Sequence, residues 1–99
     1  MKSLRTLLKV AKRDLDLLRR QLADQIGKQM LAHERLLGHE RSMRAEQALA
    51  ARDYESARAY GGYAVRAMAM CKAIEAEKQA IEAECERLRG LISNAHIEM

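Results

Sequence analysis

The hydrophobic positions in the first part of the chain recur at the spacing of a coiled coil. From residue 4 to residue 22 they are separated by alternating steps of four and three, at Leu4, Leu8, Ala11, Leu15, Leu18 and Leu22. This heptad pattern places one stripe of a helix against a partner helix, and we call that stripe the seam. The pattern predicts a helix from about residue 3 to about residue 50.

Beyond Leu22, two registers are compatible with the sequence. Strict heptads lead to Leu36, Met43 and Ala50, but they put Gln25, Gln29 and His39 in the seam. A four-residue step instead puts Ile26, Met30, His33 and Leu37 in the seam, as a stutter that locally unwinds the supercoil. The sequence alone does not choose between the two.

The second part of the chain is more regular. Exact steps of seven join Tyr60, Ala67, Ile74, Ile81, Leu88 and Ala95, and a companion row four residues on holds Ala64, Cys71, Lys78, Cys85 and Ile92. Six consecutive heptads in one phase predict a second long helix, from about residue 54 to about residue 96.

The connection between the helices is predicted near residues 51–55. Asp53 can accept hydrogen bonds from the first free backbone N–H groups of a helix that begins at Tyr54, and Glu55 favours its first turn. Such a turn sets Leu18 opposite Leu88, whereas the alternative turn at Gly61-Gly62 leaves the leucine seam of the first helix without a partner. The expected fold is all-α, with two long helices forming an antiparallel coiled-coil hairpin as a single domain over residues 1–99.

Composition agrees with this fold and narrows the function. The chain has no Pro, Phe or Trp and three tyrosines, so its packing must rely on aliphatic side chains and alanine. Lys9, Lys12 and Arg13 interrupt the apolar positions of the N-terminal segment, so we expect neither an export signal nor a membrane span. The cysteines, Cys71 and Cys85, lie too far apart on one helix for a disulfide, which fits the cytosol.

Residues suited to catalysis or metal binding are not grouped along the chain. His33, His39 and His96 are not three or four positions apart, and the cysteines form no CxxC pair. The acidic residues between Glu75 and Glu86 are balanced by Lys72, Lys78, Arg87 and Arg89, as expected for a solvated helix face. We therefore expect no catalytic residues, no metal and no cofactor, and a protein that is not an enzyme.

Positive charge is concentrated at the N-terminal end. Residues 1–20 hold seven Lys or Arg against Asp14 and Asp16, whereas the whole chain has a net charge of +4. The basic stripe is compatible with a solvated face, with nucleic acid, with acidic lipid or with an acidic protein surface. Four of its residues are the candidate binding residues of this end: Arg5, Lys9, Lys12 and Arg13.

Two adjacent glycines between tyrosines are the most unusual local feature, at Tyr60-Gly61-Gly62-Tyr63. Glycines inside a helix lower its stability, and exposed tyrosines are favoured anchors at protein interfaces. The segment is therefore either a partner-binding site or a tolerated kink with Tyr60 in the seam.

These features together resemble the flagellar export protein FliJ family, the coiled-coil stalk of the flagellar type III export ATPase. The matching segments are Met1-Lys2-Ser3-Leu4-Arg5-Thr6-Leu7-Leu8-Lys9-Val10, the charged run to Leu22-Ala23, and Tyr60-Gly61-Gly62-Tyr63 followed by Ala67, Met70 and Ile74. The resemblance spans most of the chain, and the order of segments carries it more than any one motif.

The resemblance implies a non-enzymatic adaptor of protein export and motility. The end with both termini would enter the export ATPase ring and promote its assembly, with Arg5, Lys9, Lys12 and Arg13 suggested for this contact by their charge. A helical face near the turn would contact the cytoplasmic domain of the export gate, and export chaperones would be further partners. By position, that face holds Tyr60, Tyr63, Ala67, Met70 and Ile74.

The resemblance also sets expectations about location and length. It implies a cytoplasmic protein bound peripherally to the inner face of the cell membrane at the flagellar base. Family members usually continue beyond this length, so we expect part of the end that would enter the ring to be missing. The alternatives are the stalk protein of a virulence-type III secretion system, and a basic coiled-coil scaffold that binds nucleic acid.

Overall fold

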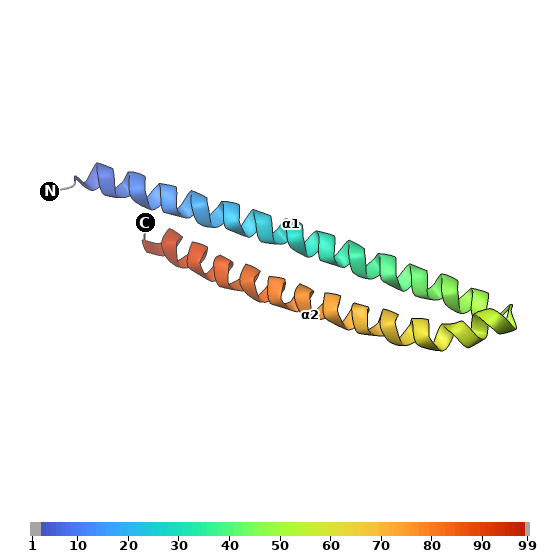
Figure 1. Cartoon of the computed structure of the whole chain (residues 1–99). Helices are drawn as coiled ribbons and strands as arrows, with labels where there is room; N and C mark the ends of the chain where they lie inside the picture. The colour runs from blue at the N-terminus through green and yellow to red at the C-terminus, as the bar shows by residue number, and fades with distance from the viewer. Residues whose placement is uncertain (1–2, 99) are drawn as a thin grey trace. The chain divides into compact units, whose positions relative to one another are not determined.

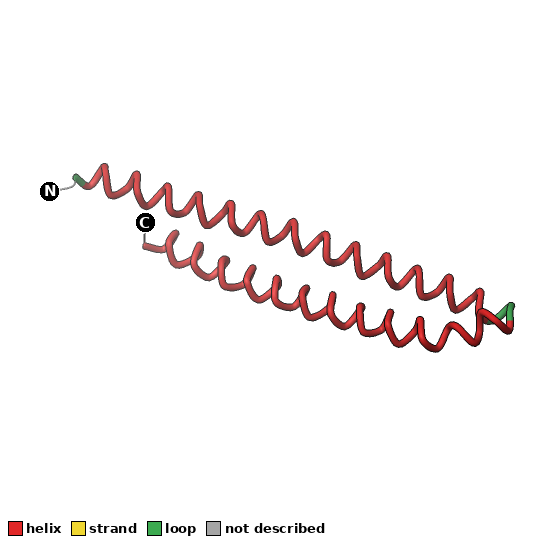
Figure 2. The backbone as a smooth tube through the Cα atoms, viewed as in Figure 1, coloured by secondary structure: helices red, strands yellow, loops and turns green. Residues whose placement is uncertain are grey.

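The computed structural model describes the backbone of residues 3–98 and the side chains of residues 3–96, and this part of the chain is two helices. Helix α1 spans Leu4–Ala50 and helix α2 spans Tyr54–Glu98, joined by a turn at residues 51–53 (Figures 1 and 2). The helices run antiparallel, so the expected all-α hairpin is confirmed. Neither helix has a stretch long and apolar enough to cross a membrane within the described residues.

The residue just before each helix caps it with its side chain. Ser3 accepts a hydrogen bond from the backbone N–H of Thr6 at 3.2 Å. Asp53 accepts one from the N–H of Glu55 at 3.3 Å and another from the Ser56 hydroxyl at 3.1 Å. Because these bonds satisfy groups that lack an intrahelical partner, they fix where α1 and α2 start.

Gly61 and Gly62 lie inside α2, so the chain does not turn there. No described glycine has a positive φ, and the two glycines follow the helix like their neighbours. The capping by Asp53 therefore places the connection before the glycines.

The contacts divide the chain into two compact units, which we describe separately. The terminal unit comprises Met1–Gln29 and Ala80–Met99, and the turn unit comprises Met30–Gln79. Each unit contains a segment of both helices.

In the terminal unit, the seams of the two helices face each other. Leu15, Cys85 and Leu88 are buried there. The remaining seam positions that the two helices share are half-buried, namely Ala11, Leu18, Leu22, Gln25, Gln29, Ile81, Ile92 and Ala95. The Gln29 amide donates to the Glu82 carboxylate at 3.4 Å, which joins α1 to α2 at the edge of the seam.

In the turn unit, Ala32, Ala67 and Ile74 are buried. Polar pairs flank this core, because the Arg35 guanidinium lies 3.0 Å from the Glu77 carboxylate and Lys78 Nζ lies 3.3 Å from His33 Nδ1. The other half-buried seam positions are Leu36, His39, Met43, Ala50, Tyr60, Ala64, Cys71 and Lys78.

From Ala11 to Met43 the seam of α1 keeps strict heptads. Gln25, Gln29 and His39 occupy it, whereas Met30 is 61% exposed and Leu37 is 39% exposed. The stutter is therefore not used. Two helices that pack along a common stripe need the same repeat of hydrophobic positions, so α1 follows the seven-residue repeat of α2. As a consequence, apolar side chains of α1 such as Met30 and Leu37 remain in solvent.

The pairing of the helices differs from the sequence expectation by about one helical turn. The Gln29–Glu82 hydrogen bond places these two residues level with each other. Seven residues back along α1 is Leu22, and seven residues on along α2 is Arg89. In this register Leu22, rather than Leu18, is nearly level with Leu88. The reason lies at the start of α2, where residues 54–59 are exposed apart from the half-buried Ser56. The seam of α2 begins only at Tyr60, after a first stretch of helix that packs little.

Replacing Ile74 with Ala tests the core of the turn unit. Ile74 is 1% exposed, so the variant should lose about 2–5 kcal/mol of unfolding free energy in urea denaturation followed by circular dichroism. The control is Val65→Ala, at a position 70% exposed on the same helix, which should change stability by less than about 0.5 kcal/mol. Equal losses in the two variants would contradict this packing.

The register is tested by thiol crosslinking in a chain whose native cysteines are replaced by alanine. A Leu22→Cys, Leu88→Cys pair should react with a short bifunctional thiol reagent within one chain faster than a Leu18→Cys, Leu88→Cys pair. Faster crosslinking of the Leu18→Cys, Leu88→Cys pair at equal protein concentration would instead support the register expected from the sequence.

Candidate partner-binding surfaces

The four basic candidates all lie on the exposed surface of α1 in the terminal unit. Arg5, Lys9, Lys12 and Arg13 occupy its first turns, outside the buried part of the seam. We call these four residues the terminal basic surface. All four side chains are exposed, and none fills the core.

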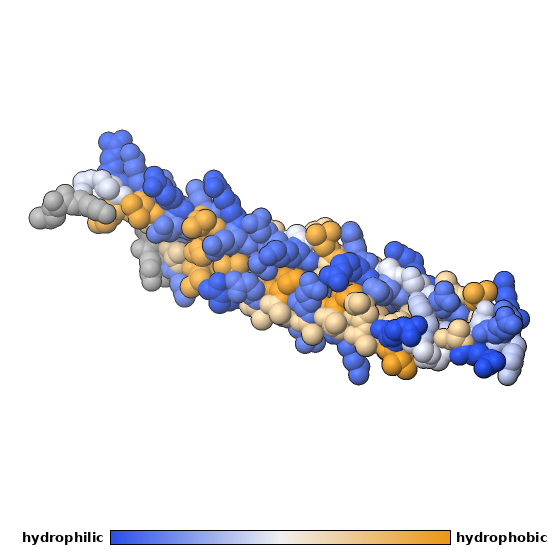
Figure 3. Space-filling model, in the orientation of Figure 1, coloured by the Kyte–Doolittle hydropathy of each residue, from blue (hydrophilic) through white to orange (hydrophobic). Residues whose placement is uncertain are grey.

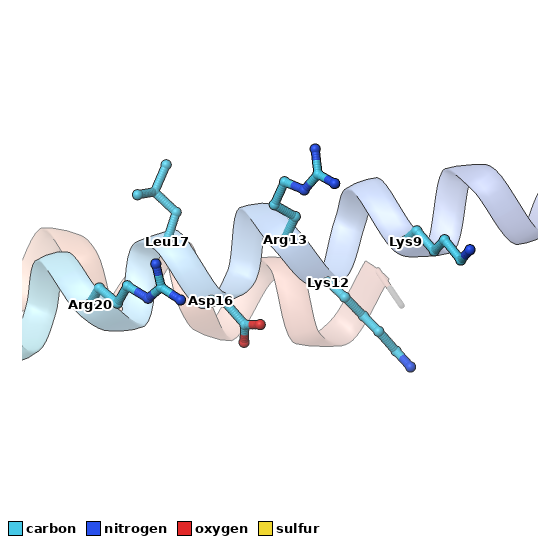
Figure 4. A pocket seen from close by; sticks show the side chains of 6 residues that line it. All are labelled: Lys9, Lys12, Arg13, Asp16, Leu17 and Arg20. Carbon is cyan, nitrogen blue, oxygen red and sulfur yellow. The ribbon is translucent and has the colours of Figure 1, made fainter.

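Three of these residues help to line a shallow depression of about 580 Å³ on α1. The lining side chains are Lys9, Lys12, Arg13, Asp16, Leu17 and Arg20 (Figure 4). They do not converge on one point, since Arg13 and Leu17 extend to one side of the helix and Lys12 and Asp16 to the other. A small ligand needs convergent polar groups, so this arrangement suits an extended macromolecular surface better.

A second depression, of about 490 Å³, is lined by residues of both helices of the terminal unit. Its lining comes from Lys12, Leu15, Asp16, Arg19 and His96. Asp16 and Arg19 form an exposed ion pair at 3.6 Å there. The sequence did not indicate that His96 reaches this surface, because its position depends on which residue of α1 it meets.

The tyrosine segment lies in the turn unit and is only partly accessible. Tyr60 and Tyr63 are half-buried, with ring centroids 6.3 Å apart, and Met70 is 45% exposed. Ala67 and Ile74 are instead buried between the helices. A partner that docks on the folded hairpin therefore has Tyr60, Tyr63 and Met70 available, and it would reach Ala67 and Ile74 only if the helices separated.

The two glycines of this segment are not required by packing within the chain. A methyl group at Gly61 would meet nothing within 4 Å, and one at Gly62 would meet only the end of the flexible Arg66 side chain, at 3.4 Å. Both glycines are exposed. They leave a smooth, bare stretch of helix backbone between the two tyrosines.

The histidines and cysteines form no metal centre in the part of the chain that the structure describes. Cys85 is buried in the seam, and the half-buried Cys71 directs its thiol towards the Met43 sulfur at 3.8 Å. Both cysteines thus occupy seam positions, as small hydrophobic side chains do.

The acidic run of α2 is a solvated face held by ion pairs. Glu84 pairs with Arg87 at 2.6 Å and Glu86 with Arg89 at 2.8 Å. The hydrogen bond from Arg87 lowers the pKa of Glu84 below its ordinary value, and the same contact raises the pKa of Arg87. The exposed ion pair fully explains both pKa shifts, so they do not point to a catalytic site.

Comparison with known proteins does not identify a relative of this chain. No family model, curated protein or solved structure matches this chain. Any functional assignment therefore rests on the surfaces themselves and on the resemblance of the sequence segments.

Gly61→Ala is expected to stabilise the hairpin by about 1 kcal/mol, because alanine is the better helix former and its methyl group meets no neighbour. Chemical denaturation measures the change. Gly90→Ala is the matched control, because Gly90 is also an open helical position, in the terminal unit, and should give a similar gain. A loss of stability in Gly61→Ala alone would show that the turn unit needs this glycine for folding.

Proposed function

We propose that this protein is a non-enzymatic adaptor of the flagellar type III export apparatus, similar to the FliJ family. In this role the terminal basic surface binds the export ATPase and promotes assembly of its ring. The turn unit contacts the cytoplasmic domain of the export gate, and export chaperones bind the hairpin as further partners. The protein would act in the cytoplasm, at the inner face of the membrane at the flagellar base.

The observation that carries the proposal is that the two units of the hairpin present different surfaces, one exposed and basic, the other formed by half-buried tyrosines and Met70. The unit with both chain ends presents Arg5, Lys9, Lys12 and Arg13, none of which packs in the core. The other unit presents Tyr60, Tyr63 and Met70 beside bare glycine backbone. An adaptor needs two such separate contacts, and this division corresponds to the two ends that the sequence resemblance assigns to two partners.

The hairpin architecture also supports an adaptor role. A pair of helices buries only one stripe of each helix, so most of the surface stays available to other proteins. On the face shown in Figure 3, hydrophobic side chains lie among hydrophilic ones. The exposed apolar side chains include Leu17, Leu31 and Met68, which the hairpin itself does not bury.

Copurification with the export ATPase of the same organism tests the terminal basic surface. The chain should bind the ATPase, and ring assembly and ATP turnover should rise in its presence. Reversing the charge of Arg5, Lys9, Lys12 and Arg13 to Glu should weaken binding about tenfold or more, because each contact changes from attraction to repulsion.

The matched control reverses four exposed arginines of the turn unit and its turn, Arg41, Arg44, Arg52 and Arg58. It changes the net charge by the same amount and should leave ATPase binding within about twofold. Equal losses of ATPase affinity in the two variants would show that binding depends on net charge and not on the terminal basic surface. Salt-sensitive binding to DNA with no binding to the ATPase would favour the nucleic-acid scaffold instead.

A further inference from the structure

Four exposed apolar side chains of the turn unit lie at coiled-coil spacing but outside the seam. Met30 and Leu37 lie seven residues apart on α1 and are 61% and 39% exposed. Val65 and Met68 lie three residues apart on α2 and are 70% and 55% exposed. Both helices run through the whole of this unit, so these side chains are exposed beside a complete seam (Figures 1 and 2). We call Met30, Leu37, Val65 and Met68 the second apolar face.

The four residues share one side of the seam, opposite the Arg35–Glu77 ion pair. Along a helix of a coiled coil, residues that directly precede seam positions lie on one side of the seam, and residues that directly follow them lie on the other. Arg35 and Glu77 both precede seam positions and meet at 3.0 Å, so the preceding residues of α1 and α2 are on the same side of the hairpin. Each residue of the second apolar face directly follows a seam position. The face therefore lies on the opposite side, with two of its residues on each helix.

The second apolar face is elongated along the hairpin. The Arg35–Glu77 ion pair makes Leu37 nearly level with Glu75, because each lies two residues nearer the turn than its neighbour in the pair. Met68 lies one heptad from Glu75, so about 10 Å of helix axis separates Met68 from the level of Leu37. A compact ligand would contact the residues of one helix only, whereas a helix that lies along the hairpin can reach all four.

Basic residues continue the two outer rows of the face. Arg44 lies one heptad after Leu37, and Arg58 and Lys72 lie one heptad before and one heptad after Val65. All three basic side chains are exposed, and none takes part in an ion pair of the described residues. No acidic residue occupies these two rows within the turn unit. A helix laid along the face would place its own flanking residues beside these rows, where acidic side chains are favoured and basic ones are repelled.

We propose that the second apolar face binds an amphipathic helix of a partner protein, with an apolar heptad stripe and Glu or Asp at the positions that flank it. Met30 and Leu37 belong to the row that a stutter would have placed in the seam, and the strict heptads of α1 leave this row free for a second helix. The inference goes beyond the proposed function, because Tyr63 and Met70 directly precede seam positions and so lie on the other side of the hairpin.

Two other occupants fit the second apolar face less well. A second copy of this chain that packed the same face would bring no acidic row to Arg44, Arg58 and Lys72, and it would meet them with the same basic residues. An anionic membrane surface would also meet Glu40 and Glu75, which directly follow seam positions and lie on this side. A partner helix avoids that repulsion, because its acidic residues are needed only at the flanking positions.

A designed peptide tests the proposal without the export ATPase. The probe is a helix of about four heptads with Leu at both seam rows and Glu at both flanking positions, too highly charged to pair with itself at neutral pH. One comparison peptide has Lys in place of each Glu, and another has the composition of the probe in scrambled order. Binding to the 99-residue chain is measured by fluorescence anisotropy, and its position by amide chemical-shift changes in the ¹⁵N-labelled protein.

The acidic heptad peptide should bind, and the two comparison peptides should bind at least about tenfold more weakly. Shift changes should be concentrated in residues 30–44 and 58–72. Val65→Ser with Met68→Ser should weaken binding about tenfold or more, and so should Arg58→Glu with Lys72→Glu. Because the replaced side chains are exposed, circular dichroism should show unchanged helix content.

Matched controls alter the same unit outside the face. Leu31→Ser with Leu49→Ser replaces two exposed leucines that directly precede seam positions, and it should change the affinity less than about twofold. Arg52→Glu with Arg66→Glu changes the net charge as much as the basic variant does, at exposed positions away from the two rows, and it should also have an effect below about twofold.

Three results would overturn the proposal. They are equal binding of the scrambled or Lys peptide, affinity unchanged in Val65→Ser with Met68→Ser, and no binding of the acidic peptide at all. Dimerisation of the chain alone that requires Val65 and Met68, measured by sedimentation, would assign the face to a second copy instead. Binding to anionic phospholipid vesicles with the same requirement, and none to the peptide, would assign it to a membrane.

Discussion

The structure depends on one narrow stripe of contact between two helices. Only Leu15, Ala32, Ala67, Ile74, Cys85 and Leu88 are buried among the described residues, and they are spread over both units. A hairpin has no second layer of side chains behind this stripe, so each buried position counts for a large share of the local packing energy. The seam positions between them are only half-buried, and several of these are polar.

The polar residues at seam positions have hydrogen-bond partners at the edge of the seam. Lys78 is in the seam but lies beside the ring of the exposed His33, and Gln29 reaches the edge of α2 through Glu82. The described side chains include no buried polar atom without a hydrogen-bond partner. These contacts satisfy the interrupting groups without adding much stability, which leaves aliphatic burial as the main stabilising interaction.

Periodicity predicted most of the fold because a coiled coil is specified by a repeat that can be counted. Every seam position expected in α2, from Tyr60 to Ala95, is buried or half-buried. Periodicity could not set the pairing of the helices, since sliding one helix by a turn preserves both stripes. That choice depends on how α2 leaves the turn, and residues 54–59 give no pattern that reveals it. Nor could one helix alone decide between strict heptads and a stutter, because the partner helix sets the common period. The basic residues of the candidate site were predictable from charge, whereas the burial of Ala67 and Ile74 and the contribution of His96 follow from the packed hairpin.

The two cysteines give the hairpin its own chemical reporters. Cys85 is 1% exposed in the terminal unit, whereas Cys71 is half-buried in the turn unit. A thiol reagent can reach Cys85 only while the helices around it are apart, so the rate of its modification measures how often that unit opens. The half-buried Cys71 can be reached without such a separation, so the two thiols would react at different rates and report on different units.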